Sequence, residues 1–264
     1  MTPDIGALGP IVARKHRDAE SLRCAAAGLW AKAESLPVAP DPATILRRGG
    51  VIAEMKRRSP SGGSLRPALD PARLAHWYAA AGARAVSVLT DAEDFGGSMD
   101  DLAAVRHAVD IPVLRKDFIV DSIQVAESRV AGADWVLLIA ALLDGDGLDE
   151  CLDAANRAHA GVIVEVHDED EVGLALASGA TCIGINNRDL RTLGTDLGTF
   201  ARLRRMIPPD MCCVAESGVG IAADAARLVS DGADAVLVGE ALMRAESPRA
   251  ACAAIVAAAA AAAS

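Results

Sequence analysis

Charged and amide side chains follow several short apolar runs of this 264-residue chain, each at the point where the run ends. The run VIAEMK, which starts at Val51, carries Glu54 and Lys56 two residues apart, so both side chains lie on one face of an extended strand. The same place in later runs is held by Lys116, Glu165, Asn186, Arg188, Glu216 and Ser217. Carboxylates and ammonium groups in a half-buried pocket keep each other ionised and shift each other's pKa, which prepares them as general acids and bases. These residue types predict proton-transfer chemistry on an anionic substrate.

The charged residues must be positioned by helices and strands, and four Gly-Ala pairs indicate that these elements repeat along the chain. Their glycines are Gly82, Gly132, Gly179 and Gly232, at intervals of 50, 47 and 53 residues, and each pair leads into a short apolar run. Glycine can end a helix in the left-handed conformation that other residues avoid, and the run after it fits a buried parallel strand. A fixed period of this size indicates a repeated unit of strand, helix, strand, helix.

Four further apolar runs lie between those strands and start at Val51, Val113, Val162 and Cys212. Eight strands that alternate with helices favour an α/β fold, the closed parallel (β/α)8 or TIM barrel, in a domain of about 250 residues. An open doubly wound sheet is the alternative, but no Gly-x-Gly-x-x-Gly follows the first strand, which argues against its dinucleotide-binding form. In a closed barrel the carboxyl ends of the strands meet at one mouth, so we expect the residues above around one cavity.

We expect a single domain, with residues 1–47 as a helical extension, 48–245 as the barrel and 246–264 as an alanine-rich helix with a frayed end. The formal net charge of −10 argues against a nucleic-acid partner, because binding to the phosphate backbone uses clustered Lys and Arg. The chain has no run of the roughly 20 apolar residues that a membrane span needs, and no signal-peptide pattern. These features predict a cytoplasmic protein without membrane contact, either a monomer or a weak homo-oligomer.

Cysteines and histidines give no sign of a metal site. The six cysteines have no Cys-x-x-Cys spacing and no histidine at ligand distance in the sequence, so we expect reduced structural thiols and no metal. His16, His76, His107 and His159 fall in predicted helices with polar faces, where we expect solvated side chains.

Two glycine-rich loops, ESGVG from Glu216 and GEALM from Gly239, follow the seventh and eighth strands. In this fold the loops at that position commonly hold phosphate through backbone N–H groups and helix N-termini. Gly218, Gly220 and Gly239 permit close backbone approach. The loops therefore predict a phosphate site.

Six segments resemble the indole-3-glycerol phosphate synthase family, in the family's order and with comparable spacing. They are IAEMKRRSPS (52–61), SVLTDAEDFGGS (87–98), VLRKDFIVDSIQ (113–124), VEVHDEDE (164–171), GINNRDL (184–190) and AESGV (215–219). The resemblance implies a carboxy-lyase of tryptophan biosynthesis that acts on 1-(2-carboxyphenylamino)-1-deoxyribulose 5-phosphate. An anthranilate ring carbon attacks the sugar carbonyl, carbon dioxide leaves, and water is lost to give indole-3-glycerol phosphate. No step needs a redox cofactor or a metal, and we expect none.

The resemblance also implies roles for single residues. Lys116 matches the general acid at the carbonyl oxygen, Lys56 the lysine that contacts the substrate carboxylate and moves protons, and Glu54 and Glu165 the acid–base carboxylates. The remaining matches are Asn186, which positions the substrate; Arg188, near its carboxylate; Glu216 with Ser217, the strand-seven pair; and Ser59, Ser217, Gly218, Gly239 and Glu240, at the phosphate.

Lys116 shares its strand face with Leu114 and Phe118, and Phe118 is a further candidate for substrate contact. An ammonium that is partly removed from water has a lowered pKa and gives up its proton more readily. We therefore expect burial to lower the pKa of Lys116 and to make it the proton donor.

Some positions depart from the family pattern. Gly62 and Gly63 stand in the loop after the first strand, where the family often has lysine. Glu240 stands where many relatives have serine, so its charge has to point away from a phosphate. Two other functions stay open on the same barrel: a phosphosugar isomerase or aldolase that forms a Schiff base through Lys56 or Lys116, and a non-catalytic phosphate-binding paralogue.

Overall fold

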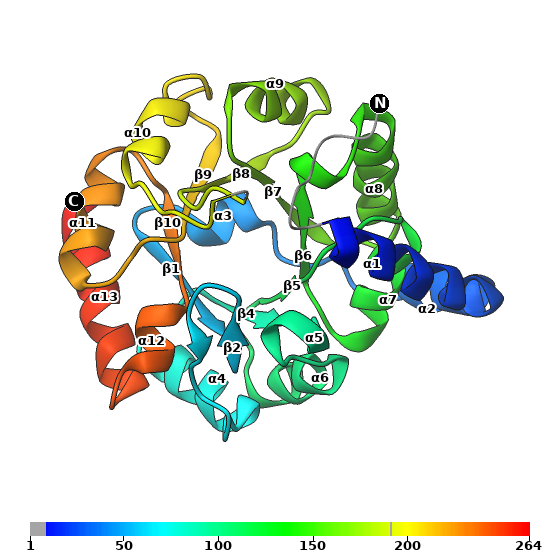
Figure 1. Ribbon diagram of the computed structural model, residues 1–264, viewed down its shortest axis with the longest axis horizontal. Helices are drawn as coiled ribbons and strands as arrows, with labels where there is room; N and C mark the ends of the chain where they lie inside the picture. The colour runs from blue at the N-terminus through cyan, green and yellow to red at the C-terminus, as the bar shows by residue number, and fades with distance from the viewer. Residues whose placement is uncertain (1–8, 191) are drawn as a thin grey trace.

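The structure, a computed structural model, describes residues 9–190 and 192–264. It is a closed barrel of parallel strands ringed by helices (Figure 1). The barrel strands are β1 (Gly50–Met55), β4 (Ala85–Leu89), β5 (Val113–Lys116), β6 (Trp135–Ile139), β7 (Gly161–Val166), β8 (Cys182–Asn186), β9 (Cys212–Glu216) and β10 (Ala235–Val238). They follow the order β1-β10-β9-β8-β7-β6-β5-β4, and β1 pairs with both β10 and β4. This closure confirms the predicted (β/α)8 barrel. The alternative prediction, an open doubly wound sheet, is wrong.

Helices follow the strands and cover the outside of the barrel. They are α4 (Pro71–Ala80), α6 (Met99–Ala108), α7 (Ile123–Ala131), α8 (Gly145–Arg157), α9 (Glu169–Ala177), α10 (Gly198–Arg204), α11 (Ala222–Ser230) and α13 (Pro248–Ala262). Helices α1 (Gly9–Leu22), α2 (Ala26–Glu34) and α3 (Pro42–Leu46) precede the barrel, with the 3-10 turn η2 (Arg23–Ala25) between the first two. Loops hold α5 (Ala92–Phe95), η3 (Ala140–Leu142), α12 (Glu240–Arg244) and a small hairpin, β2 (Arg58–Ser59) with β3 (Gly63–Ser64).

The local sequence sets where helices begin and end. The Asp70 carboxylate accepts from Arg73 N at 3.1 Å at the start of α4, and the Asp168 carboxylate accepts from Glu171 N at 3.0 Å at the start of α9. The four repeat glycines follow α4, α7, α9 and α11. Gly82, Gly132, Gly179 and Gly232 have φ of 93°, 107°, 79° and 103°. The prediction that these glycines end helices in the left-handed conformation is confirmed.

Apolar side chains form one layer between strands and helices and a second inside the barrel. The interior cluster includes Ile52, Leu114, Leu137, Ile163 and Val214. Leu46 of α3 belongs to it as well, and the indole N–H of Trp135 donates to the Pro40 carbonyl at 2.6 Å. Because Trp135 is the first residue of β6, α3 and the segment before it close the amino-terminal end of the barrel. The carboxyl end is left for a site.

The alanine-rich end of the chain forms α13, which packs against α11, α4 and β1. It runs from Pro248 to Ala262 and buries Cys252, Ile255 and Ala259. All six cysteines are free thiols, and five of them are buried.

The histidines expected at solvated surfaces lie largely there. His16, His76 and His107 are exposed, and His159 is half-buried in the turn after α8. Within the described residues, no helix combines the length and the apolar character that crossing a bilayer demands.

Replacing Gly179 by alanine is expected to destabilise the fold by about 1–2 kcal/mol, the usual penalty for a Cβ in the left-handed conformation. Gly173, inside α9, is the matched control, because a Cβ at either glycine meets no atom within 4 Å. There alanine is expected to stabilise by about 0.5–1 kcal/mol, since it favours a helix interior. Urea unfolding of the two variants measures both effects. Equal effects of the same sign would show that backbone conformation does not distinguish the two sites.

Candidate active site

A cavity of about 170 Å³ lies among the carboxyl ends of the strands. Except for Gly220, the residues predicted for the site line it: Glu54, Lys56, Ser59, Lys116, Phe118, Glu165, Asn186, Arg188, Glu216, Ser217, Gly218, Gly239 and Glu240. The barrel thus brings together side chains from strands that are far apart in the sequence. The cavity is the candidate active site.

Lys116 is the centre of the polar groups in this cavity. Its Nζ donates to Glu165 Oε2 at 2.7 Å and lies 3.7 Å from Glu216 Oε2. The other oxygen of Glu165, Oε1, accepts from Asn186 Nδ2 at 3.0 Å. Residues from β5, β7 and β8 therefore share one hydrogen-bonded group, and Glu216 of β9 joins it through the longer ion pair.

Three carboxylates keep the Lys116 side chain protonated by raising its pKa. Burial alone would lower the pKa of this ammonium, but the negative charges of Glu165, Glu216 and Glu54 outweigh burial and raise it. The lowered pKa expected from the sequence is therefore wrong, because carboxylates on other strands face the same ammonium. Glu165 shows the opposite balance: burial would raise its pKa, but Lys116 and His167 hold it well below its ordinary value.

Glu216 is the carboxyl group that stays neutral. Burial and the nearby charge of Glu165 raise the pKa of Glu216 to about 8. Its Oε1 is buried and has no hydrogen-bond partner among the described residues. Gly184 on the adjacent strand β8 leaves room for this oxygen, because a Cβ there would overlap it. At neutral pH the group can donate a hydrogen bond or a proton into the cavity.

Glu54 and Lys56 form a second ion pair in the cavity, as their spacing predicted. Lys56 Nζ donates to Glu54 Oε1 at 2.6 Å. A Cβ at Gly239, in the loop after β10, would overlap that same oxygen. Glycine at 239 therefore leaves the space that the carboxylate of Glu54 occupies.

His167 is a site residue that the sequence analysis did not identify. Its Nε2 lies 3.1 Å from Glu165 Oε1, an ion-pair distance without the alignment of a hydrogen bond, and its Nδ1 lies 2.9 Å from Glu171 Oε2 on α9. Burial would lower the imidazole pKa, but the two carboxylates raise it to about 10, so the ring is a cation at neutral pH. A signal was present: Glu165 and His167 are two residues apart at a strand end, as Glu54 and Lys56 are.

Asn187 holds the end of β9 in place. Its Nδ2 donates to the carbonyls of Glu216 and Ser217, both at 3.1 Å, and its Oδ1 accepts from Phe200 N at 2.9 Å. Asn187 is buried, and it ties the strand that carries Glu216 to α10. The sequence analysis did not single out Asn187, because it alternates with Asn186 and Arg188, the positions that were assigned to the cavity.

Ser217 and Gly218 form a turn of unusual backbone geometry beside the cavity. Their φ values are 64° and 89°, and a residue with a Cβ rarely adopts the conformation of Ser217 outside functional sites and tight turns. A Cβ at Gly218 would lie 2.6 Å from Leu197 Cδ2, so only glycine fits. Gly220 is different, because its N–H already donates to Asp224 Oδ2 at 2.9 Å.

The loop after β1 is held by an arginine of α12. Arg244 Nη2 donates to the Gly62 carbonyl at 2.8 Å, and Arg244 Nε donates to Glu240 Oε1 at 2.9 Å. The carboxylate of Glu240 is thus paired with a cation. A Cβ at Gly62 would lie only 3.2 Å from Arg244 Nη2 and 2.8 Å from Ser59 Oγ, so glycine admits this arrangement. Arg244 brings a positive charge to the loop where the family often has lysine.

Arg188 and Phe118 both line the cavity. Arg188 donates through its backbone N–H to Asn186 Oδ1 at 3.0 Å and through Nη1 to the Leu193 carbonyl at 2.7 Å. The ring of Phe118 is buried and lies 6.1 Å from that of Phe95. The lining of the cavity therefore includes a cation and a pair of aromatic rings.

The raised pKa of Glu216 predicts a pH-dependent difference in stability between the protein and Glu216→Gln. A group whose pKa is higher in the folded than in the unfolded state loses its contribution to stability as pH rises towards the folded value. Glutamine does not titrate, so the variant should gain stability relative to the parent between pH 4.5 and pH 8. Urea unfolding at these two pH values measures the change. A difference that is independent of pH would show that the pKa of Glu216 is the same in the folded and the unfolded protein.

Comparisons with known proteins place the chain in a family. The profile of the indole-3-glycerol phosphate synthase family matches residues 19–255. A curated indole-3-glycerol phosphate synthase from Nocardioides sp. is 54% identical over 213 residues, which cover 80% of this chain and 82% of the relative. Another, from Parafrankia sp., is 52% identical over 225 residues and 84% of each chain.

The solved structures add a likeness of fold. A crystal structure of 3-hexulose-6-phosphate synthase matches with a TM-score of 0.60 and 20% identity, over 79% of this chain and 99% of that one. Fold, cavity and relatives agree with the motifs of the sequence. The chain belongs to the indole-3-glycerol phosphate synthase family.

Proposed function

We propose that the residues of the cavity carry out the ring closure of the family, with Lys116 as general acid. As a member of its family the chain is a lyase of tryptophan biosynthesis that forms indole-3-glycerol phosphate from a phosphorylated sugar–anthranilate substrate. The observation that carries the assignment is the Lys116 ammonium, which is in contact with Glu165 and faces Glu216 in the cavity.

Lys116 is suited to the first step because it stays protonated until negative charge develops. Attack of the anthranilate ring carbon turns the sugar carbonyl oxygen into an alkoxide, which the ammonium stabilises and then protonates. A Schiff-base lysine needs a neutral amine, and the raised pKa of Lys116 argues against that chemistry. Schiff-base formation by Lys116, as an aldolase would require, is therefore disfavoured.

The remaining steps need a site for the substrate carboxylate and groups that exchange protons. Lys56 binds the carboxylate that leaves as carbon dioxide, and the electron pair of the broken bond returns to the ring. The new hydroxyl then leaves as water with a proton from an acid, while a carboxylate takes a proton from the ring methylene. Glu54 and Glu165 serve as these acid–base carboxylates, and Glu165, which is held ionised, suits the role of acceptor. Asn186 keeps Glu165 oriented through its hydrogen bond.

The substrate phosphate lies at the turn after β9 and the loop after β10. The proposed contacts are Ser59, Ser217, Gly218, Gly239 and Glu240, the last through its backbone, since its carboxylate is paired with Arg244. The anthranilate ring lies against Phe118, and Arg188 approaches its carboxylate. No residue role here requires a metal or a redox cofactor, because each step moves only protons and carbon–carbon or carbon–oxygen bonds.

We further propose that the enzyme is one domain, and a monomer or a weak homo-oligomer. The contacts of α13 with α11 and α4 support its inclusion in the barrel. The large apolar side chains exposed among the described residues are Val38, Leu193, Met206 and Ile221. Each lies in a different loop, whereas a stable interface needs a contiguous apolar patch.

Lys116→Met and Lys56→Met should separate the two lysines. Loss of a general acid typically slows a reaction by about 10²–10⁴-fold, so kcat of Lys116→Met should fall by at least that range while KM changes little. Lys56→Met should raise KM and lower kcat together, because Lys56 also binds the substrate carboxylate. Turnover of synthetic substrate, followed by indole fluorescence, measures both. If Lys116→Met keeps near-normal kcat and loses affinity, the two roles have to be exchanged.

Substrate without its phosphate should bind at least about 100-fold more weakly, because backbone amides and helix N-termini then have no anion to bind. Competition of the dephosphorylated compound against substrate measures its affinity. Glu240→Ser is a useful companion, since it restores the residue common in the family and should leave phosphate binding intact or stronger. Equal affinities for the two compounds would show that the anion site has been placed wrongly.

A further inference from the structure

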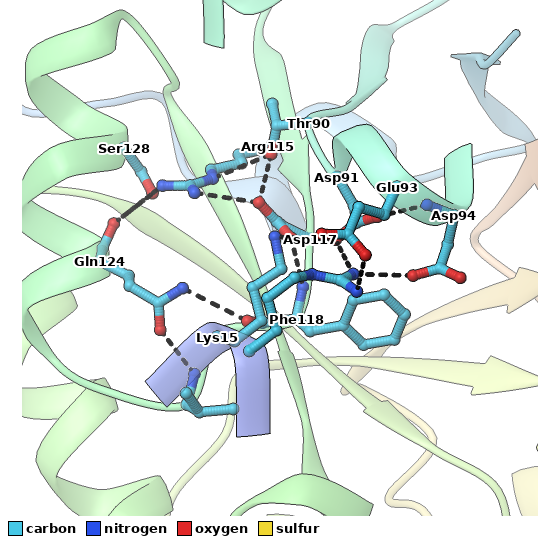
Figure 2. Close-up of polar contacts among 12 residues, drawn as sticks. Lys15, Thr90, Asp91, Glu93, Asp94, Arg115, Asp117, Phe118, Gln124 and Ser128 are labelled. Carbon is cyan, nitrogen blue, oxygen red and sulfur yellow. Dashed lines mark hydrogen bonds and ion pairs between the residues drawn. The ribbon is translucent and has the colours of Figure 1, made fainter. Parts of the chain in front are cut away.

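Lys15 on α1 is a buried cation, with 6% of its surface exposed. Its Nζ lies 2.7 Å from Asp117 Oδ1 and 2.9 Å from Asp91 Oδ2, and Figure 2 shows the side chain pointing towards these carboxylates. Burial would lower the pKa of Lys15, but Asp117 and Asp91 raise it. The N-terminal helix is therefore tied to the loops after β4 and β5 by one charge.

Asp117 is the residue that follows Lys116, and it is buried beside the cavity. Its Oδ1 also accepts from the backbone N–H of Phe118 at 2.8 Å, while its Oδ2 accepts from Thr90 Oγ1 at 2.5 Å and from Arg115 Nη2 at 3.0 Å. Burial would raise the pKa of Asp117, but Arg115 and Lys15 lower it. The carboxylate that receives Lys15 thus fixes the backbone on which both Lys116 and Phe118 depend.

The outer part of the same network fixes α5. Arg14 Nη2 lies 2.7 Å from both Asp91 Oδ2 and Asp94 Oδ2, and Arg14 Nη1 lies 2.9 Å from Glu93 Oε2. The Asp91 carboxylate also caps α5, by accepting from Asp94 N at 2.8 Å. Phe95, at the end of α5, lines the cavity. Two adjacent cations of α1 therefore contact both loops that carry the aromatic residues of the cavity, Phe95 and Phe118.

Ile11 connects this network with the cavity. It lies four residues before Lys15, so both side chains are on the same face of α1. Ile11 is buried, belongs to the apolar cluster of the barrel interior together with Phe118, and lines the cavity. When Lys15 is paired with Asp91 and Asp117, Ile11 is held against the substrate site.

We propose that Lys15 is a positioning residue: its two ion pairs hold α1 on the barrel so that Ile11 forms a wall of the substrate cavity. The proposal rests on the ring closure assigned to this cavity. Lys15 itself touches no reacting atom. Its removal leaves Asp117 bound to Thr90 and Arg115, so the effect reaches the substrate through the position of α1.

The test compares Lys15→Met, Ile11→Ala and the double variant in steady-state kinetics, with hydrogen exchange of the α1 amides as a second readout. Each single variant should raise KM about tenfold, which corresponds to about 1.4 kcal/mol. The double variant should raise KM no further, because both changes remove the same wall. Arg23→Gln is the matched control: Arg23 also joins this N-terminal segment to the barrel, through Asp121, but it is 59% exposed, so KM should change less than twofold.

Exchange of the α1 amides should be at least tenfold faster in Lys15→Met and unchanged in Arg23→Gln. A hundredfold rise of KM in the double variant would overturn the proposal, because Lys15 would then act independently of Ile11. Unchanged exchange in Lys15→Met would overturn it as well, because Lys15 would then not hold α1 on the barrel. If Lys15→Met gives little folded protein, Arg14→Gln repeats the test on the outer cation, with smaller effects in the same direction. Absence of turnover in the parent would instead count against the proposed function, and the exchange result would still stand.

Discussion

A buried ammonium has to be paired, and the organisation of this site follows from how Lys116 is paired. Glu165 lies at 2.7 Å and Glu216 at 3.7 Å from its Nζ. Lys116 holds Glu165 ionised, while burial and the charge of Glu165 keep Glu216 neutral up to about pH 8. His167 adds a second positive charge beside Glu165, and Asn187 fixes the strand end that carries Glu216. One acid and one base are thereby prepared in a single cavity.

The barrel makes this arrangement possible by bringing strand ends together and by leaving space at chosen positions. Gly184 and Gly239 sit where a Cβ would overlap a carboxylate oxygen of a neighbouring strand. Outside the barrel, α3 closes the amino-terminal end, while Lys15 holds α1 beside the carboxyl end. The barrel is therefore closed at its amino-terminal end by α3 and carries polar groups at its carboxyl end. Helix α1 lies beside that end and is attached by ion pairs.

Features of the fold and the site that depend on local periodicity could be predicted from the sequence. Alternation along a strand placed Glu54 beside Lys56, and the repeat glycines marked where helices end. The same alternation applied to Glu165 would have found His167. The pKa of Lys116 was mispredicted because its sign depends on distances between β5, β7 and β9, which no single segment encodes. The partners of Lys15 were beyond prediction for the same reason, since Asp91 and Asp117 lie more than 70 residues away in the chain.

The central claim is that Lys116 delivers its proton to the oxygen that begins as the substrate carbonyl. The most direct measurement is a crystal structure of the enzyme with substrate whose ketone has been reduced to an alcohol, which binds but cannot close the ring. The alcohol oxygen is expected to lie within hydrogen-bond reach of Lys116 Nζ, about 2.6–3.2 Å, with the phosphate at Ser217 and Gly218. An alcohol oxygen that contacts Lys56 instead, with Lys116 still bound only to Glu165, would contradict it.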